Sequence, residues 1–336
     1  MEAADLTATA DRTPAEQLAD FARRRPAWTA VGVLAVIVLV MVAAKGLHDV
    51  AQTGLNGLSL GAVYALGAIG LTLVYGILKL VNFAHGDFLT FGAYMAYLVS
   101  VTWGLPLIVA ILFAMTLTAC LGLIFERIMW RPMRARGAGF LQLLLMSIGL
   151  ALIIRAGIQW FWGTNVRFLD VNTTSTVEFL GLEIGRTNLI VIIVGFAVLV
   201  AVGVMLRYAL LGKQMRAIAD DLDLAETAGV DTTRVITYTW LFAGVLAGLA
   251  GVLAAAVTDV EPELGFELLL PIFAAVIVGG IGDPFGALAG GITLGVITEW
   301  STLFVEPRWK TAMAFVVLVI VLVIRPQGIF GKARSL

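Results

Sequence analysis

Ten apolar runs recur along this chain, and most approach the roughly 20 residues that an α-helix needs to cross a bilayer. They cover residues 28–44, 55–78, 88–103, 106–126, 140–162, 188–206, 235–258, 268–281, 286–304 and 311–324. The chain is 60% hydrophobic and only 13% charged, which is more apolar surface than a soluble fold can bury. We therefore expect an all-α polytopic membrane protein with about ten transmembrane segments, two of them short or broken.

Basic residues predict the orientation of these segments, because Lys and Arg are enriched in cytoplasmic loops. If the runs alternate across the bilayer, one side collects Arg23–Arg25, Lys79, Arg127, Arg131, Arg134, Arg136, Arg207, Lys213, Arg216, Arg234, Arg325, Lys332 and Arg334. The other side receives 163–187 and the acidic stretch 259–267. We expect both termini in the cytoplasm, with an N-terminal extension (1–27), a membrane domain (28–325) that includes a cytoplasmic loop (207–234), and a cytoplasmic tail (326–336).

Ten segments divide into two halves of five, and an odd number per half places the second half upside down relative to the first. The sequence VNFAHGDF at 81–88 aligns with VEPELGFE at 260–267, matching Val81 to Val260 and Gly86 to Gly265. Inverted repeats of this kind are common in transport folds, where the substrate route lies near the interface of the halves. We expect a 5+5 inverted repeat with interruptions at Gly86 and Gly265, and a chain reversal at Asp283 and Pro284.

The polar residues Asn82, His85 and Asp87 stand between two strongly apolar runs. Non-helical backbone at membrane depth is tolerated only where protein or a water-filled cavity satisfies its polar groups. One interpretation is a helix break that lines a translocation route. The other is a polar connection at the cytoplasmic surface, with Asp87 as the N-cap of a helix that begins at Phe88. The residues alone leave both open.

The loop at 206–235 carries apolar residues at helical spacing, among them Met215, Ile218 and Ala225, between charged positions. Gly229 can end the short helix. Such a helix can lie on the membrane surface or dock in a groove of a cytoplasmic partner.

Enzyme chemistry has little to build on in this sequence. There is no GxxxxGK[ST] phosphate-binding pattern, so ATP hydrolysis is not expected in this chain. The histidines are His48 and His85 alone, the only cysteine is Cys120, and no metal-ligand spacing is present.

Several stretches, in this order and spacing, resemble the branched-chain amino acid ABC transporter permeases of bacteria, the LivH type. They are GLSLGAVYALGAIGLTLVYGILKLVNFAHGDF, MRAIADDLDLAETAGVDTTRV, VIVGGIGDPFGALAGG and RPQGIFG, and the similarity covers roughly residues 50 to 332. The resemblance implies a location in the bacterial inner membrane and four kinds of partner: a second permease subunit, two cytoplasmic ATPases that hold ATP and Mg²⁺, an external binding protein and the lipid bilayer. It implies no cofactor in this chain and no nucleic acid.

The resemblance implies a role for the loop at 206–235, and the residue types suggest roles for others. A coupling helix that contacts an ATPase is expected at Met215, Arg216, Ala217, Ile218, Asp220, Asp221, Leu224, Ala225 and Gly229. For the substrate pathway we expect Asn82, Phe83, His85, Asp87, Glu261 and Glu263, although the two glutamates could instead form an outer rim that docks the binding protein. Arg155 and Glu299 are charges near the outer ends of their segments, and they either pair with each other or reach the interface separately.

The implied function is an importer subunit for branched-chain or other hydrophobic amino acids. Two alternatives stay open. Related permeases take urea, short amides or other small organic solutes. A protein of another class, a secondary transporter driven by protons through His85, Asp87 and Glu299, would need no ATPase.

Overall fold

The computed structural model describes residues 26–171, 175–179, 181–325 and 327–328. The predicted N-terminal extension up to residue 25, and the predicted tail apart from residues 327 and 328, lie outside the described residues. The chain divides into two units, Met1–Ala51 and Gln52–Leu336. In the first unit, α3 (Pro26–Lys45) is followed by the non-helical Gly46. α4 (Leu47–Leu78) begins directly after Gly46 and continues into the second unit. Gly46 has a φ of +89°, a conformation that favours glycine at the end of a helix.

In the second unit, a helix occurs at every further range where the sequence predicts a membrane segment. After α4 come α5 (His85–Tyr97) with the π-helix η1 (Leu98–Thr102), α6 (Leu107–Phe125) with η2 (Glu126–Trp130) and α7 (Arg131–Ala135), α8 (Phe140–Trp162), α9 (Arg186–Tyr208), α12 (Thr232–Val257), α13 (Leu264–Gly279), α14 (Pro284–Ser301), η3 (Pro307–Trp309) and α15 (Lys310–Ile324). The short helices α10 (Leu210–Asp220) and α11 (Leu222–Thr227) follow α9. Within the described residues, six helices are long and apolar enough to cross a membrane. The molecule is therefore a mostly helical, multi-pass membrane protein.

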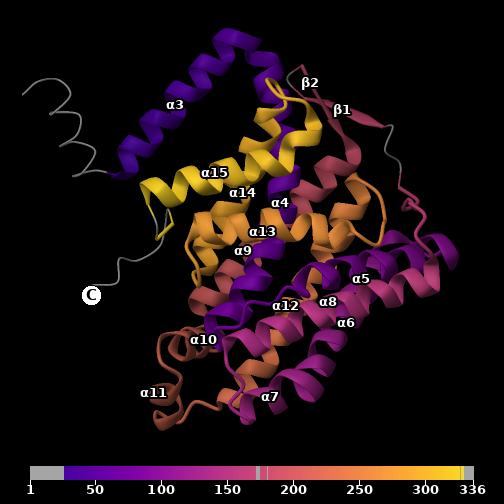
Figure 1. Ribbon diagram of the computed structural model, residues 1–336. Helices are drawn as coiled ribbons and strands as arrows, with labels where there is room; N and C mark the ends of the chain where they lie inside the picture. The colour runs from indigo at the N-terminus through magenta and orange to yellow at the C-terminus, as the bar shows by residue number, and fades with distance from the viewer. Residues whose placement is uncertain (1–25, 172–174, 180, 326, 329–336) are drawn as a thin grey trace, which may run out of the picture. The chain divides into compact units, whose positions relative to one another are not determined.

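Two helices form the centre of the second unit. In the most apolar stretches of α4 and α12, 89% and 78% of the residues are buried, against 11% to 33% in the other long spans. α12 packs on α5 and α6, and α13 packs on α5, α14 and α15 (Figure 1). The outer helices keep apolar side chains on their surface, as expected for helices that face lipid rather than water.

Small residues allow the close contacts in this centre. Gly244 of α12 lies against the backbone of Ala119 of α6, so that a side chain on Gly244 would overlap it. In a second contact of this kind, Gly291 of α14 lies against the backbone of Ala65 of α4. Each of the two contacts therefore joins a helix of the first half of the sequence to a helix of the second half.

Where α5 and α13 cross, Gly86 and Gly265 meet. A Cβ on either residue would overlap the carbonyl oxygen of the other. Thr90 of α5 adds a hydrogen bond, its Oγ1 accepting from the backbone N–H of Gly265 at 2.9 Å. The expected interruptions at Gly86 and Gly265 are not turns. Both glycines lie in the first turns of α5 and α13, where their missing side chains permit backbone contact.

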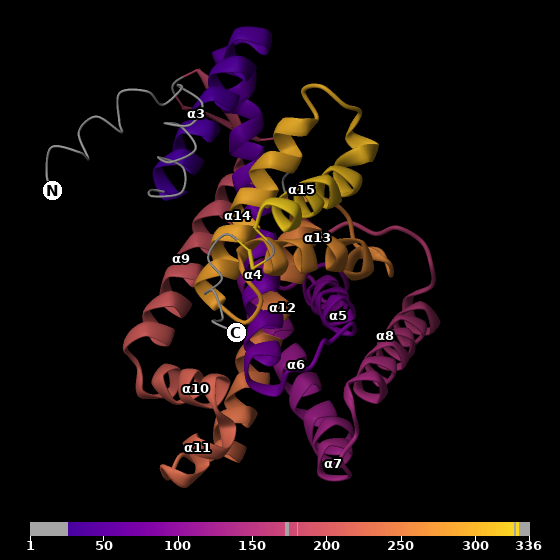
Figure 2. The same ribbon diagram turned by 60° about the vertical axis from the view of Figure 1, so that its left-hand side comes forward.

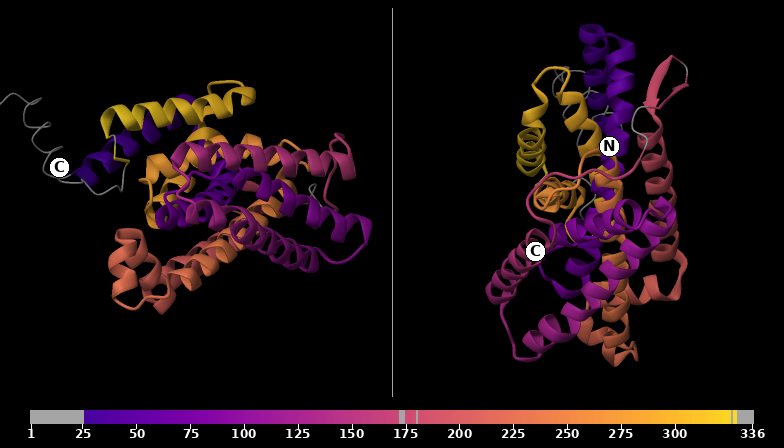
Figure 3. Two further views of the ribbon diagram at one scale, coloured as in Figure 1. Left: turned by 60° about the horizontal axis from the view of Figure 1, so that its bottom comes forward. Right: turned by 90° about the vertical axis from the view of Figure 1, so that its right-hand side faces the viewer.

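A two-stranded hairpin, which the expected all-α class did not include, occupies the loop before α9. β1 (Thr176–Phe179) pairs antiparallel with β2 (Leu182–Gly185), with Thr176 opposite Gly185. Gln52 fastens the hairpin to α4, because its side-chain oxygen accepts from the backbone N–H of Glu183 at 3.0 Å. The hairpin projects from the start of α9 (Figure 3), whereas α7, α10 and α11 lie at the other end of this unit (Figures 1 and 2).

Candidate functional site

The segment between α4 and α5 is non-helical, and hydrogen bonds from its backbone to side chains hold it in place. The side-chain oxygen of Asn82 accepts from the backbone N–H of Ala84 at 3.1 Å, and Ser147 Oγ of α8 accepts from the N–H of Phe83 at 3.2 Å. Asn82 is fully buried, and its amide nitrogen has no hydrogen-bond partner among the described residues. At Asn82 the segment is therefore a buried break in the helical structure.

His85 begins α5 and fastens it to α4. Its Nε2 lies 3.0 Å from the carbonyl oxygen of Gly67, which makes Nε2 the protonated nitrogen, and its ring packs against Gly70. The side chain is 1% exposed. Because Gly67 and Gly70 have no side chains, the imidazole can approach the α4 backbone this closely. His85 thus links the break to the centre of α4.

Asp87 is not the N-cap of a helix that begins at Phe88, because α5 already begins at His85. It lies in the first turn, where its carboxylate accepts from Arg155 Nε of α8 at 3.0 Å. The guanidinium of Arg155 also lies over the ring of Phe266 of α13, 4.6 Å from its centroid. Arg155 therefore joins three helices, and the buried charge of Asp87 is paired as buried charges require.

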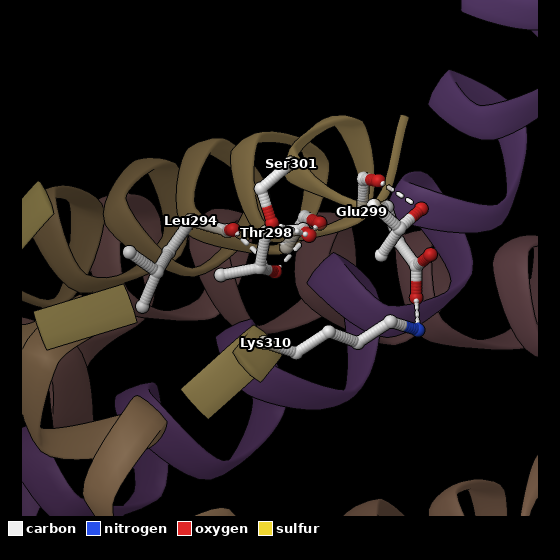
Figure 4. A network of polar contacts seen from close by, with 7 residues as sticks. Leu294, Thr298, Glu299, Ser301 and Lys310 are labelled. Atoms are coloured by element: carbon white, nitrogen blue, oxygen red, sulfur yellow. Dashed lines mark hydrogen bonds and ion pairs between the residues drawn. The ribbon is translucent and has the colours of Figure 1, made fainter. Parts of the chain in front are cut away.

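Of the two alternatives for Arg155 and Glu299, pairing with each other does not occur, because each is paired with another residue. Lys310 Nζ of α15 lies 2.5 Å from Glu299 Oε1 of α14, as Figure 4 shows beside the backbone-bonded hydroxyls of Thr298 and Ser301. The reason is the packing. α8 lies against α5, while α14 lies against α13 and α15, so each charge meets an opposite charge on its own neighbour.

Phe83 lines an apolar cavity of about 360 Å³ between α4 and α13. Its ring packs on Phe273 with 5.1 Å between centroids. The other lining residues are Leu71, Tyr75, Val81, Leu270, Val276, Ile277 and Ile281. This cavity lies toward the C-terminal ends of both helices and offers almost no polar atoms.

A second cavity, of about 650 Å³, lies toward the N-terminal ends of α4 and α13 and is strongly polar. It includes Glu261, which is half-buried in the loop between α12 and α13. Burial raises the pKa of the Glu261 carboxyl, and the neighbouring carboxylates Asp259, Glu267 and Glu263 raise it further. Along α4, Gly67 lies between the residues that line the two cavities, and it contacts the side chain of Ile272 of α13.

The two glutamates that the sequence assigned to one pathway point to different places. Glu261 lines the polar cavity. Glu263 instead accepts a hydrogen bond from Gln159 Nε2 of α8 at 3.0 Å, next to the Asp87 and Arg155 pair. The structure thus brings Asp87, Glu263 and Arg155 together with Gln159, which sequence reasoning missed. A signal for the ion pair was present in the sequence, since Asp87 directly precedes an apolar run and Arg155, of opposite charge, lies within one.

The predicted coupling residues fall into two groups. Met215, Ile218 and Ala225 are buried against the protein itself, so they anchor α10 and α11 and are not accessible to a partner. The remaining residues of the predicted set are exposed: Arg216, Ala217, Asp220, Asp221, Leu224 and Gly229. Asp221 caps α11, its side chain accepting from the N–H of Leu224 at 2.9 Å, and Gly229 follows α11 with a φ of +85°.

Two further predicted features are local. Asp283 caps α14, its side chain accepting from the N–H of Phe285 at 3.0 Å, and Pro284 is the first residue of the helix. Gly280 and Gly282, with φ of +114° and +89°, reverse the chain there. At the end of α4, Lys79 Nζ donates to the carbonyl of Ala219 at 3.1 Å, which fastens α10 to α4.

These features define a class of protein: a multi-pass helical membrane protein with two cavities along one pair of helices and an exposed helical loop at one end. Residues 54–322 match the family described as the permease component of branched-chain amino acid transport systems. The chain belongs to this family.

Individual relatives cover almost the whole chain. The high-affinity branched-chain amino acid transport system permease protein LivH of Salmonella typhimurium is 32% identical over 84% of this chain and 95% of its own. The permease BraD of Pseudomonas aeruginosa is 30% identical over the same shares. The permease LivM of Escherichia coli is 25% identical over 90% of this chain and 75% of its own.

Proposed function

We propose that this chain is a membrane subunit of an ATP-driven importer for branched-chain or other hydrophobic amino acids. Its family membership and the two cavities along α4 and α13 support the proposal. The polar cavity suits the charged groups of an amino acid, and the apolar cavity suits its aliphatic side chain. We place the barrier between the two cavities at the contact of Gly67 with Ile272, whose opening would admit solute from one cavity to the other.

The proposed topology has ten spans arranged as a 5+5 inverted repeat, with both termini in the cytoplasm of a bacterial inner membrane. Helices at all ten expected ranges support the count. The reciprocal contact of Gly86 with Gly265 supports the repeat, since these residues are equivalent in the alignment of the halves. A pseudo-two-fold axis between them would relate α5 to α13 and the Gly244–Ala119 contact to the Gly291–Ala65 contact.

The loop 207–234 is the proposed docking site for a cytoplasmic ATPase, which binds ATP and Mg²⁺ in place of this chain. The exposed face of α10 and α11 supports this role, because Leu224 is 66% exposed beside the acidic Asp220 and Asp221. A movement of α10 would reach α4 through the hydrogen bond of Lys79 with Ala219. α4 in turn holds Gly67, one side of the constriction.

The proposed assembly contains a second permease, two ATPases and an external binding protein. The relationship to both LivH and LivM supports a pair of different permeases rather than two copies of one. The hairpin β1–β2 lies at the opposite end of this unit from α10 and α11 (Figure 1), which leaves it, with the acidic loop 259–263, for the external partner.

The test is uptake into proteoliposomes that contain the complete assembly. Labelled leucine and labelled urea are offered outside, with binding protein, and ATP is supplied inside. We expect leucine to accumulate only when ATP is present. Its uptake should not change when proton ionophores are added. Urea uptake without leucine uptake would favour the short-amide alternative, and uptake abolished by ionophores but independent of ATP would favour a proton-driven transporter.

A further inference from the structure

The polar cavity has a composition that the general pathway role leaves unexplained. Among its lining residues, Asp259, Glu261, Glu267 and Glu299 carry negative charge, and Arg308 and Lys310 carry positive charge. Lys310 is paired with Glu299, and Arg308 is paired with the exposed Glu306 outside the cavity. The carboxylates of Asp259, Glu261 and Glu267 have no basic partner among the described residues. The cavity therefore presents an excess of negative charge.

A buried hydroxyl faces the same cavity. Ser59 of α4 lines it, is 3% exposed, and its Oγ has no hydrogen-bond partner among the described residues. A buried hydroxyl without a partner costs free energy, so such groups in native proteins call for a specific explanation. A solute with hydrogen-bonding groups, held in the cavity, would supply the missing partner.

We infer that this cavity is an amino-acid site within the permease itself, in which Glu261 and Glu267 bind the α-ammonium group and Ser59 hydrogen-bonds the same solute. The inference rests on the proposed function and adds a binding step inside this chain, separate from the external binding protein. The carboxylate of the solute meets Lys310, whose ammonium has three donors and uses one on Glu299 (Figure 4).

The charges determine which solutes the site accepts. An ammonium ion among three unpaired carboxylates is attracted, whereas an anion that lacks an ammonium group is repelled. An uncharged amide such as urea gains no ion pair. The site therefore selects for a cationic amino group first and for a carboxylate second.

The experiment measures labelled leucine binding to the full chain in lipid nanodiscs, without binding protein or nucleotide. Competitors are isoamylamine, which is leucine without its carboxylate, isocaproate, which lacks the ammonium group, and urea. We expect isoamylamine to displace leucine and isocaproate and urea to fail. Loss of one charged contact in Glu261→Gln or Glu267→Gln should weaken binding about tenfold or more, and Ser59→Ala by a smaller factor.

Glu178→Gln is the matched control, because it makes the same chemical change on the exposed hairpin β1, outside the lining of this cavity. All variants are checked by size exclusion, so that misfolding is not read as lost binding. Equal displacement by isocaproate and isoamylamine, or unchanged affinity in all three cavity variants, would overturn the inference. So would the absence of leucine binding to the wild-type chain.

The uptake assay keeps this inference apart from the proposed function. ATP-driven leucine accumulation by the complete assembly, with no leucine binding to the chain alone, would reject the cavity site and leave the importer standing. Leucine binding that depends on Glu261, in an assembly that accumulates nothing with ATP, would reject the importer and leave the site standing.

Discussion

Gly86 and Gly265 each occupy the space that a side chain on the other would need. A Cβ on either would overlap the other's carbonyl oxygen, so the crossing of α5 and α13 exists only with glycine at both positions. We expect Gly86→Ala and Gly265→Ala each to destabilise the chain by at least the roughly 1–3 kcal/mol typical of overpacking, because backbone must move to relieve the overlap. Thermal unfolding in detergent is the measurement.

Gly149→Ala is the control for that prediction. Gly149 is also a helical glycine, in α8, but a Cβ there has nothing within 4 Å. Its replacement should leave stability unchanged or slightly raised, since alanine favours helix by about 1 kcal/mol over glycine. Equal melting temperatures for all three variants would show that α5 and α13 do not meet as described.

The ion pair of Asp87 with Arg155 gives a second prediction. Asp87→Asn or Arg155→Met leaves a buried charge unpaired and should cost roughly 3–5 kcal/mol. The double variant should recover a large part of this loss, because neither charge then remains. The exposed pair of Arg308 with Glu306, 2.7 Å apart, is the control, and its removal should cost about 0–1 kcal/mol. Additive losses in the Asp87 and Arg155 double variant would argue against a direct pair.

In the coupling loop, we expect some substitutions to affect partner binding and others to affect folding. Leu224→Arg changes an exposed residue of α11, so the chain should remain folded while co-purification of the ATPase is lost. Met215→Ala removes a buried anchor and should destabilise the chain by roughly 2–5 kcal/mol. Full ATPase recovery with Leu224→Arg would contradict the proposed docking face. Glu178→Gln changes the hairpin β1, at the opposite end of the unit from α11, and serves as the control whose ATPase co-purification should be unchanged.

The raised pKa of Glu261 predicts a pH dependence of leucine binding. Its ionised form attracts the ammonium group, and its neutral form does not. Because burial and the carboxylates of Asp259, Glu267 and Glu263 raise this pKa, binding should weaken on acidification before an ordinary glutamate, with a pKa near about 4.3, takes up its proton. In Glu261→Gln this early inflection should disappear, and its persistence would assign the titration to another group.

Sequence reasoning located the helices well and their partners poorly. The run 140–162 coincides with α8, because length and apolar composition act locally and need no knowledge of neighbours. Arg155 was placed in that run correctly, but its partner Asp87 was not among the alternatives considered, since two charges at similar depth are compatible with several packings. The start of α5 was also missed, because the buried turn at Asn82 moves the helix start from Phe88 to His85.

The loop at 206–235 shows the same limit. Helical spacing predicted an amphipathic helix there, and α10 and α11 have buried Met215, Ile218 and Ala225 on one side. Spacing identifies an apolar face but not what covers it. The face that seemed available for a partner is used by the chain itself, and the partner is left with the exposed residues around Leu224.

Reconstituted uptake of labelled leucine by the complete assembly tests the central claim most directly. The account predicts accumulation against a gradient that requires ATP, is lost when Leu224→Arg removes the ATPase, and continues when ionophores remove the proton gradient. Accumulation by this chain alone, powered by an ion gradient and unchanged by ATP, would contradict it.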